Sequence, residues 1–561
     1  MLFYDFEVFK YDWLVVIVDT DTQSTHVIIN DEQLLIDFYH QHKENIWIGY
    51  NSNGYDRYIL KGIVCGFNPS EINDWIIVKR KKGWEFSSQL NRIPLYNYDV
   101  QVNKYYSLKQ LEAFMGHDIR ETTVPFDLDR KLTDEEIEEV VFYCKHDVHE
   151  TMEVFSHQIT EFDSQLSLIR EFKLPLKHIS KTQAQLSSVI LGARDAKLDD
   201  DDHIFLADTL RIEKYKEVED FFESGGSING DLDIDISGVP HTFADGGLHG
   251  AIKKYHFECG PDELLIMADV DQLYPTMMIE YNLLSRGVRE PEKFENILET
   301  SLRLKREKKK KQREPYKRIC NITYGAEGDK YNAMYDPRNR RLVCIYGQLF
   351  LLDLIEKLEE IPSFKLIQSN TDGVLSRIKR EDFELFDDII YEWEQRTRLS
   401  MSFDFYKKIH QKDVNNYLVV DLEGGHKSKG AYVKKLSPLD YDLPIVNKAV
   451  VEYFVSGTPV KETINNCDEL IMFQKIVKLT NKFDYALYGK KKQYLKVFRL
   501  IASKTGKQLM KVKGNSIQRI SYTPDVCKIV NTDITKEKAP DWLDRSWYIE
   551  MAQKRVNDFL G

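Results

Sequence analysis

The sequence predicts a mixed α/β protein with several domains, and three features support this class. The chain has 561 residues, more than a single hydrophobic core usually holds. An apolar run at 264–268 predicts a buried strand that ends at Asp269, and 276–284 follows with helical spacing. Residues 364–378 predict two short strands joined by a tight turn, in which Gly373 supplies a positive φ and Asp372 lies at the tip.

The N-terminal part places acidic side chains at the ends and on the faces of predicted elements. Residues 1–18 predict a hairpin whose first strand carries Asp5 and Glu7 at i and i+2, on one face. Asn51 and Asp56 flank the start of a predicted helix. Taken singly, these acids fit a solvent-facing strand edge and a helix terminus.

A capping box at 133–136 predicts a second helix, on which Tyr143 and Asp147 share a face. Helical spacing also predicts helices at 342–361 and 542–560. The carboxylates of the N-terminal part and the phenol of Tyr143 together form a set that suits divalent cations.

Residues 294–327 predict two basic helices joined near 313–315, because proline is favoured in a first helical turn. Lys317, Asn321 and Tyr324 have the spacing i, i+4 and i+7, which places them on one helical face. An ordinary amphipathic helix would show the same spacing.

The net charge of −12 hides two basic segments that interleave Tyr, Phe or Leu with the charge. Residues 303–318 hold ten Lys or Arg and two Glu, and residues 475–519 hold thirteen Lys or Arg and one acid, Asp484. Such patches beside a metal site predict contact with a phosphate backbone. Acidic runs at 127–139 and at 199–202, the latter predicted as an exposed turn, balance them.

Seven cysteines without a C-x-x-C pair predict reduced thiols and argue against disulfides or structural zinc. We expect no signal peptide, because Asp5 and Glu7 interrupt the N-terminus. The apolar run at 13–18 is too short to span a bilayer. A cytoplasmic protein without a membrane partner is the expectation.

Three motifs occur in a fixed order, and each has a physical place on a predicted element. They read D-x-x-x-L-Y-P at 269–275, K-x-x-x-N-x-x-Y-G at 317–325, and T-D at 371–372. This order resembles motifs A, B and C of the family B DNA polymerases, most closely the compact bacteriophage type.

Three further motifs precede them. They read D-x-E at 5–7, N-x-x-x-Y-D at 51–56 and Y-x-x-x-D at 143–147, with S-L-x-x-L at 107–111 between the last two. This set resembles the proofreading 3′–5′ exonuclease of the same polymerases.

The resemblance implies an RNase H-like exonuclease followed by a right-hand polymerase of palm, fingers and thumb. The implied domains are an exonuclease at 1–165, a connecting segment at 166–250, palm at 251–290 and 335–437, fingers at 291–334 and a thumb at 438–561. A glycine element with Gly246, Gly247 and Gly250 would link the two modules.

For the polymerase site, the resemblance implies two Mg²⁺ ions, with Mn²⁺ as a substitute, and two-metal nucleotidyl transfer. Asp269, Asp372 and the backbone carbonyl of Val270 would hold the ions. Tyr274 would exclude a ribose 2′-OH, Lys317 would meet the triphosphate, Asn321 would lie beside the nucleotide and Tyr324 under the nascent base pair. A second triphosphate cation is expected within 303–311, with Lys305 as a candidate.

For the exonuclease site, the resemblance implies two metal ions on Asp5, Glu7, Asp56 and Asp147, with Tyr143 orienting the attacking water. Asn51, Tyr55, Ser107 and Leu108 would hold the frayed primer end. Asn53 is an alternative to Asn51, and core packing is an alternative role for Leu108. In 426–432, Lys429 and Tyr432 resemble the element that grips the primer terminus, although a basic turn would read the same way.

The sequence departs from the family at a few positions. Asn370 stands where the family has a first Asp in motif C, and we expect activity to be retained because Asp269 and Asp372 are present. Asp271 is a candidate substitute if the strand extends that far. Gln272 and Ile322 replace usual serines and bear on nucleotide geometry.

Short spacers imply how the primer is supplied. Only 36 residues separate Asp269 from Lys305 and 49 separate Asn321 from Asn370, which leaves no room for the insertion of protein-primed relatives and little for one that separates strands. We expect a nucleic-acid primer, no N-terminal uracil-reading domain, and processivity that depends on a helicase, clamp or single-strand-binding protein.

The resulting prediction is a proofreading DNA polymerase that binds primer–template DNA, single-stranded DNA and dNTPs, replicating a phage or mobile element in a bacterial cytoplasm. An exonuclease with an inactive polymerase module is the alternative that Asn370 suggests. A catalytically silent primer–template binding protein is the third.

Overall fold

The computed structural model describes residues 1–101, 106–196, 198 and 204–561, so the acidic run at 199–202 lies outside the described residues. These residues form two compact units of mixed α/β structure. Unit 1 comprises Met1–Lys181, Leu436–Ile445 and Asn465–Tyr548, and unit 2 comprises Thr182–Lys435, Val446–Ile464 and Ile549–Gly561. No helix in the described ranges is long and apolar enough to cross a membrane.

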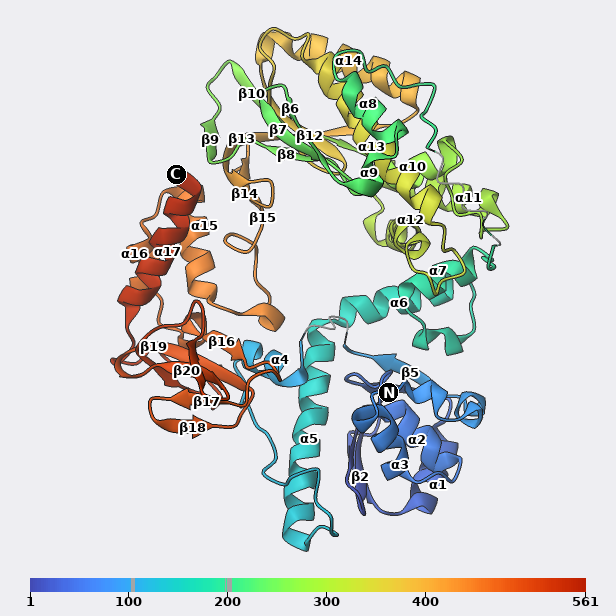
Figure 1. The fold of residues 1–561 in the computed structure, drawn as a ribbon, viewed down its shortest axis with the longest axis vertical. Helices are drawn as coiled ribbons and strands as arrows, with labels where there is room; N and C mark the ends of the chain where they lie inside the picture. Colours follow the sequence, from blue (N-terminus) through green and yellow to red (C-terminus); the bar gives the residue numbers. More distant parts are fainter. Residues whose placement is uncertain (102–105, 197, 199–203) are drawn as a thin grey trace. The chain divides into compact units, whose positions relative to one another are not determined.

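Unit 1 begins with a five-stranded sheet in the order β3-β2-β1-β4-β5 (Figure 1). The strands are β1 (Leu2–Val8), β2 (Trp13–Asp19), β3 (Ser24–Ile29), β4 (Ile46–Gly49) and β5 (Tyr96–Asp99). The predicted hairpin is confirmed, because β1 pairs antiparallel with β2, whereas β4 pairs parallel with both β1 and β5. The helices here are α1 (Glu32–His42), α2 (Asp56–Val64), α3 (Pro69–Asn73), α4 (Leu108–Met115), α5 (Asp134–His157) and α6 (Ile159–Glu171).

Strand alternation gives β1 two chemically different faces. The side chains at even positions, such as Tyr4 and Phe6, join a core with residues of α1, α2 and α3. The odd positions face α5, where Phe3 packs edge-on against Phe155 with ring centroids 5.2 Å apart. Asp5 and Glu7 therefore project toward α5, whose start at a Thr133–Glu136 capping box is confirmed.

The remainder of unit 1 holds two small antiparallel sheets. The three-stranded sheet contains β16 (Lys475–Lys478), β19 (Val497–Lys507) and β22 (Cys527–Ile529). The four-stranded sheet has the order β18 (Lys491–Gln493), β17 (Tyr485–Tyr488), β20 (Leu509–Lys513) and β21 (Ser516–Arg519). Arg499 on β19 is fully buried and donates to the carbonyls of Ala113 and His117, which ties this strand to the end of α4.

Unit 2 is built on a ten-stranded sheet in the order β15-β14-β13-β10-β12-β11-β8-β7-β6, with β9 paired to β13. The predicted strand and hairpin are confirmed as β10 (Glu263–Val270), β11 (Lys365–Ser369) and β12 (Gly373–Lys379). The other strands are β6 (Leu232–Ile236), β7 (Val239–Phe243), β8 (His249–Ala251), β9 (Tyr255–Glu258), β13 (Met401–Asp413), β14 (Asn416–Asp421) and β15 (His426–Lys429).

The helices of unit 2 include α13 (Pro337–Leu358) and α14 (Phe383–Thr397), which lie together along the sheet (Figure 1). Phe403 and Phe405 of β13 contact Phe383 of α14, so the even positions of the neighbouring β10 share that face and Asp269 projects from the other. The other helices are α7 (Gln183–Ile190), α8 (Lys216–Glu223), α9 (Gly226–Asn229), α10 (Leu273–Glu280), α11 (Pro291–Arg306) and α12 (Lys310–Glu327). Helices α15 (Pro444–Ser456), α16 (Val460–Asn465) and α17 (Arg545–Leu560) contain residues of both units.

The predicted junction of the two basic helices at 313–315 is wrong. The break lies between α11 and α12 at 307–309, where Lys308 adopts a left-handed φ of 57°. Pro315 lies inside α12. Its missing N–H leaves the carbonyl of the exposed Lys311 without its helical partner near the helix start, where solvent can replace that bond.

The compact units group the segments differently from the domains implied above. Strands β6, β7 and β8, from the segment named connecting, join the same sheet as Asp269 and Asp372. The segment named thumb is divided, with 446–464 and 549–561 assigned to unit 2 and 465–548 to unit 1.

Candidate active sites

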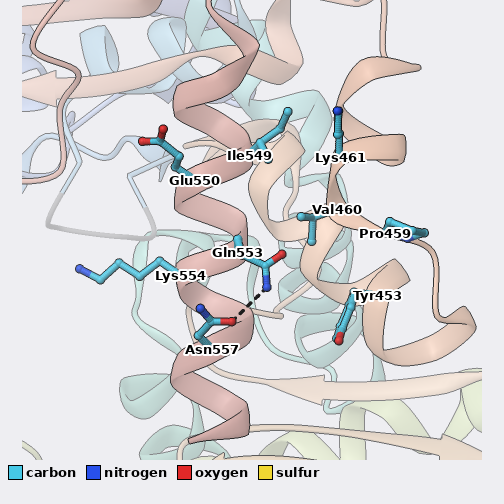
Figure 2. A pocket seen from close by; sticks show the side chains of 9 residues that line it. All are labelled: Tyr453, Pro459, Val460, Lys461, Ile549, Glu550, Gln553, Lys554 and Asn557. Carbon is cyan, nitrogen blue, oxygen red and sulfur yellow. Dashed lines mark hydrogen bonds between the residues drawn. The ribbon is translucent and has the colours of Figure 1, made fainter.

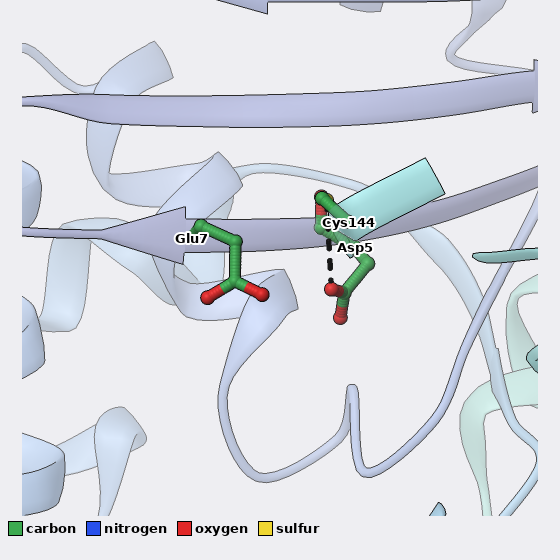
Figure 3. A group of neighbouring side chains, drawn as sticks. All are labelled: Asp5, Glu7 and Cys144. Carbon is green, nitrogen blue, oxygen red and sulfur yellow. Dashed lines mark hydrogen bonds between the residues drawn. The ribbon is translucent and has the colours of Figure 1, made fainter. Parts of the chain in front are cut away.

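Unit 1 gathers four carboxylates from three elements. Asp5 and Glu7 project from β1, Asp56 is the first residue of α2, and Asp147 lies on α5. The backbone N–H of Phe6 donates to Asp56 Oδ1 at 3.1 Å, which fixes this carboxylate beside the strand. Cys144 of α5 lies 3.6 Å from Asp5 Oδ2 through its Sγ (Figure 3).

The electrostatics of this four-carboxylate cluster are repulsive. Burial raises the pKa of Asp56 to about 7 and that of Asp147 to about 6. Burial, followed by the charges of the neighbouring carboxylates, raises the pKa values of Asp5 and Glu7 well above their usual range. Such a cluster of oxygen donors with surplus negative charge fits hard divalent cations such as Mg²⁺.

The sequence reasoning missed Lys109, whose ammonium enters this cluster. Its Nζ lies 2.5 Å from Asp147 Oδ1, 2.9 Å from Glu112 Oε1 and 4.6 Å from the ring centroid of Tyr143. Glu112 is fully buried, and its other oxygen, Oε2, lies 3.8 Å from His146 Nε2. The available signal was the i, i+3 pair of Lys109 and Glu112, directly after the S-L motif.

Tyr143 is brought to the carboxylates as expected from its place on α5. Burial, then the charges of Asp147, Glu7 and Asp5, raise its pKa, so the phenol stays protonated and is a hydrogen-bond donor. Burial also raises the pKa of Cys144 well above its usual range, which favours the thiol.

The residues predicted to hold a primer end lie outside the four-carboxylate cluster itself. Asn51 is exposed with a left-handed φ of 56°, while the Oδ1 of the alternative, Asn53, accepts from Arg57 and Asn97. The Tyr55 hydroxyl donates to Asn73 Oδ1 at 2.9 Å. Ser107 is the N-cap of α4 and Leu108, half-buried, is its first residue.

Unit 2 brings together the two acids of motifs A and C. Strand β10 pairs with β12 so that Asp269 lies opposite Gly373, and Val270 N–H donates to the carbonyl of Asp372 at 2.7 Å. The predicted positive φ at Gly373 is wrong, since Gly373 is the first residue of β12 and its φ is not left-handed. Glycine is required by space: a Cβ here would lie 2.1 Å from Asp269 Oδ1.

A third carboxylate, Asp404 on β13, was missed by the sequence reasoning. It lies opposite Met267 and therefore shares the face of β10 that carries Asp269. Burial, then Asp372 and Asp404, raise the pKa of Asp269 to about 7, against the opposing charge of Lys427. Lys427 Nζ lies 2.6 Å from Asp404 Oδ2. The available signal was the sequence Phe403-Asp404-Phe405, because alternation along a strand places Asp404 on the face opposite to the two phenylalanines.

Asp271 does not share the strand face of Asp269. Strand β10 ends at Val270, and the Asp271 carboxylate instead pairs with Lys305 and accepts from Ser402 Oγ at 3.0 Å. Lys305, a candidate for the second triphosphate cation, is thus an ion-pair partner of Asp271.

Asn370 closes the turn that carries Asp372. Its N–H donates to the Gly373 carbonyl at 2.9 Å, and its Oδ1 accepts from the Asp372 N–H at 3.3 Å. An aspartate would make the same contacts, so the amide keeps the turn while removing one negative charge.

The tyrosines of motifs A and B meet. The rings of Tyr274 on α10 and Tyr324 on α12 have centroids 4.6 Å apart, and the Tyr324 hydroxyl lies 2.7 Å from Cys344 Sγ on α13. The guanidinium of Arg340, another residue the sequence reasoning missed, lies 5.3 Å from the Tyr324 ring centroid. Burial raises the pKa of Tyr274, and Asp372 is among the charges that add to this shift.

Lys317 and Asn321 are exposed on α12, the helix that carries Tyr324.

Burial raises the pKa of Asp372, and the charge of Lys429 opposes that shift. The side chain of Tyr432 instead contacts α17, where its hydroxyl donates to Asp558 at 3.2 Å and its ring lies under the Arg555 guanidinium.

A cavity of about 520 Å³ lies between α17 and the α15–α16 region (Figure 2). Its lining, which includes Tyr453, Glu550 and Gln553, contains none of the predicted site residues. The two carboxylate clusters are therefore the candidate active sites.

No model of a known protein family matches this sequence, and no curated protein matches it. Among solved structures, the chain is similar to the family B DNA polymerase from the hyperthermophilic archaeon Pyrobaculum calidifontis. The TM-score is 0.42 and the sequence identity 13%, over 100% of this chain and 77% of that chain.

Proposed function

We propose that this chain is a template-directed DNA polymerase with a 3′–5′ proofreading exonuclease. The observation that carries the proposal is the register of β10 and β12, which sets Asp269 opposite Gly373 and so beside Asp372, on the sheet face that also carries the apolar Leu265 and Met267. The separate four-carboxylate cluster of unit 1 supports a second metal-dependent reaction.

In unit 2, Asp269, Asp372 and the Val270 carbonyl would hold Mg²⁺, or Mn²⁺ in its place. When bound, two such ions lower the pKa of a primer 3′-OH and stabilise charge on the leaving pyrophosphate. Tyr274 and Tyr324 form an aromatic pair, and we propose that the Tyr274 ring excludes a ribose 2′-OH. Lys317 and Asn321 would meet the nucleotide, and Lys429 and Tyr432 the primer.

In unit 1, Asp5, Glu7, Asp56 and Asp147 would hold two ions, which when bound activate a water for attack on a phosphodiester. Tyr143 stays protonated and can orient that water. Lys109 places a positive charge beside Asp147, which favours the ionised form of this carboxylate. Asn51, Tyr55, Ser107 and Leu108 are proposed to hold the single-stranded end.

The biological setting that we propose is replication of a phage or mobile element in a bacterial cytoplasm, from a nucleic-acid primer. The expected partners are primer–template DNA and dNTPs, together with a helicase, clamp or single-strand-binding protein.

An exonuclease with an inactive polymerase module is the second candidate, and Asn370 favours it by removing one charge near Asp372. The contacts of Asn370 with the turn backbone argue that its role is to hold Asp372.

A labelled primer on a longer template, with Mg²⁺, separates these functions. We expect extension with dNTPs and 3′ shortening without them. Asp372→Ala should abolish extension alone and Asp5→Ala shortening alone, whereas the exposed acids Asp387→Ala and Asp163→Ala serve as matched controls. Shortening in the presence of dNTPs with no extension would select the second candidate, and binding without either product would reject both.

A further inference from the structure

The four-stranded sheet of unit 1 has one face in the core and one face turned outward. On the inner face, Ala486 and Leu509 are buried in a cluster with Phe498, and Tyr488 packs against it. Side chains alternate along each strand, so the intervening positions share the outer face. None of these outer positions belongs to the two carboxylate clusters.

The strand register arranges the outer face into two ladders. In the first, Tyr485 lies opposite Val512, which lies opposite Ile517. Tyr494 extends this ladder beyond β18, since its ring centroid is 6.3 Å from that of Tyr485. In the second, the order is Lys492, Leu487, Met510 and Arg519.

The two ladders differ in chemistry. The first is aromatic and apolar, and its ends are open, since Tyr494 is 71% exposed and Ile517 is 57% exposed, whereas Val512 between them is buried. The second carries an exposed cation at each end, and Lys492 Nζ also lies 4.5 Å from the Tyr485 ring centroid. Arg519 holds an exposed ion pair with Asp525 at 2.9 Å.

We propose that this outer face binds single-stranded nucleic acid, with unpaired bases stacked on Tyr494 and packed against Ile517, and phosphates beside Lys492 and Arg519. Stacking on an aromatic ring needs a free base face, which an unpaired strand presents and a duplex does not. The charge of the surrounding chain is complementary, because residues 475–519 hold thirteen Lys or Arg and one acid.

The proposal does not depend on the metal-dependent reactions, so it can be tested with the full chain in a chelator. The probe is a fluorescein-labelled oligo(dT) of 20 nucleotides, measured by fluorescence anisotropy at fixed salt. We expect Tyr494→Ala to weaken binding about 5- to 150-fold, the range for loss of one stacked base. Tyr494→Phe, which keeps the ring, should restore binding.

Tyr391→Ala is the matched control, because Tyr391 is a 62% exposed tyrosine on α14 in unit 2. Equal losses in Tyr494→Ala and Tyr391→Ala, or no loss in either, would overturn the proposal and leave the face to a protein partner. If Tyr494→Ala weakened binding of a 20-base-pair duplex as much as binding of oligo(dT), the face would contact only phosphates. That result would also overturn the proposal.

Photocrosslinking assigns the contact, since the exonuclease site is also expected to hold a single strand. An oligonucleotide with 5-iododeoxyuridine should crosslink to the tryptic peptide 493–496, which contains Tyr494. Crosslinks confined to the peptides of α2 or α4 would contradict the proposal. If the unmodified chain showed no primer extension but still crosslinked at 493–496, the proposed polymerase would be rejected. The single-strand binding proposal would be supported.

Discussion

Lys109 illustrates how a single side chain sets the charge of a site. The four carboxylates repel one another, three of them buried and Asp5 half-buried. The Lys109 ammonium is held between Asp147 and Glu112. Burial by itself lowers the pKa of Lys109, but the charges of these two carboxylates outweigh that effect and raise the pKa above its usual value. The ammonium therefore stays charged. Burial raises the pKa of Asp147 to about 6, and Lys109 is the largest influence that opposes this shift.

Replacing Lys109 with methionine removes this opposing charge. The pKa of Asp147 should then rise, so the ionised form is reached only at higher pH and the acidic limb of the exonuclease pH–rate profile moves upward. We expect a loss of about 10- to 100-fold in shortening rate, the usual range for a residue that supports metal ligands. Primer shortening measured from pH 5.5 to 9 gives both values.

Lys109→Arg should recover part of the rate, and the exposed Lys131→Met is the control. A uniform loss at every pH, with no movement of the profile, would show that Lys109 acts only in packing.

At the scale of elements, strand pairing converts a motif into a site. Asp269 and Asp372 are far apart along the chain, but the pairing of β10 with β12 brings them together. Strand β13 adds Asp404 from a third segment. Gly373 permits this approach because its hydrogen leaves room for the Asp269 carboxylate.

Gly373→Ala tests the role of that space. The added Cβ would lie 2.1 Å from Asp269 Oδ1 and 3.0 Å from the Ala268 carbonyl, so the carboxylate or the strand must shift. We expect primer extension to fall at least about 100-fold, as for a misplacement of about 1 Å in a catalytic group. Shortening in unit 1 should be unaffected.

Gly424→Ala offers a comparison, because Gly424 has a left-handed φ of 89° but an added Cβ would meet open space. That variant should lose some stability and keep its extension rate. Full extension by Gly373→Ala would contradict the steric account.

At the scale of the whole molecule, the chain returns to unit 2 with its last segment. Residues 549–561 belong to unit 2, and their side chains Ala552, Val556 and Phe559 are fully buried. The Phe559 carbonyl also lies 2.9 Å from His256 Nε2 on β9. Unit 2, whose sheet carries Asp269, therefore also contains residues 280 to 292 positions later in the chain.

Deleting 549–561 should destabilise unit 2 by about 3–6 kcal/mol, the burial free energy of one valine and one phenylalanine. Urea unfolding followed by far-UV circular dichroism measures this loss. Deleting Gly561 alone, which is exposed, is the control. An unchanged urea midpoint after the larger deletion would contradict this account.

The sequence by itself determined the local elements and the order of the motifs. Alternation in 1–18, the capping box at Thr133, the apolar run before Asp269 and the hairpin around Asp372 are all present as predicted. These features depend on neighbouring residues, and their periodicities are readable in one dimension.

Only the tertiary structure decided which groups meet. Lys109 in the four-carboxylate cluster, Asp404 beside Asp269, the pairing of Asp271 with Lys305 and the steric need for Gly373 depend on strand register and on elements far apart in sequence. The break also lies at Lys308, which adopts a left-handed φ, rather than at Pro315. Local patterns carry no information on such long-range approach, because many registers satisfy the same alternation and only packing selects one.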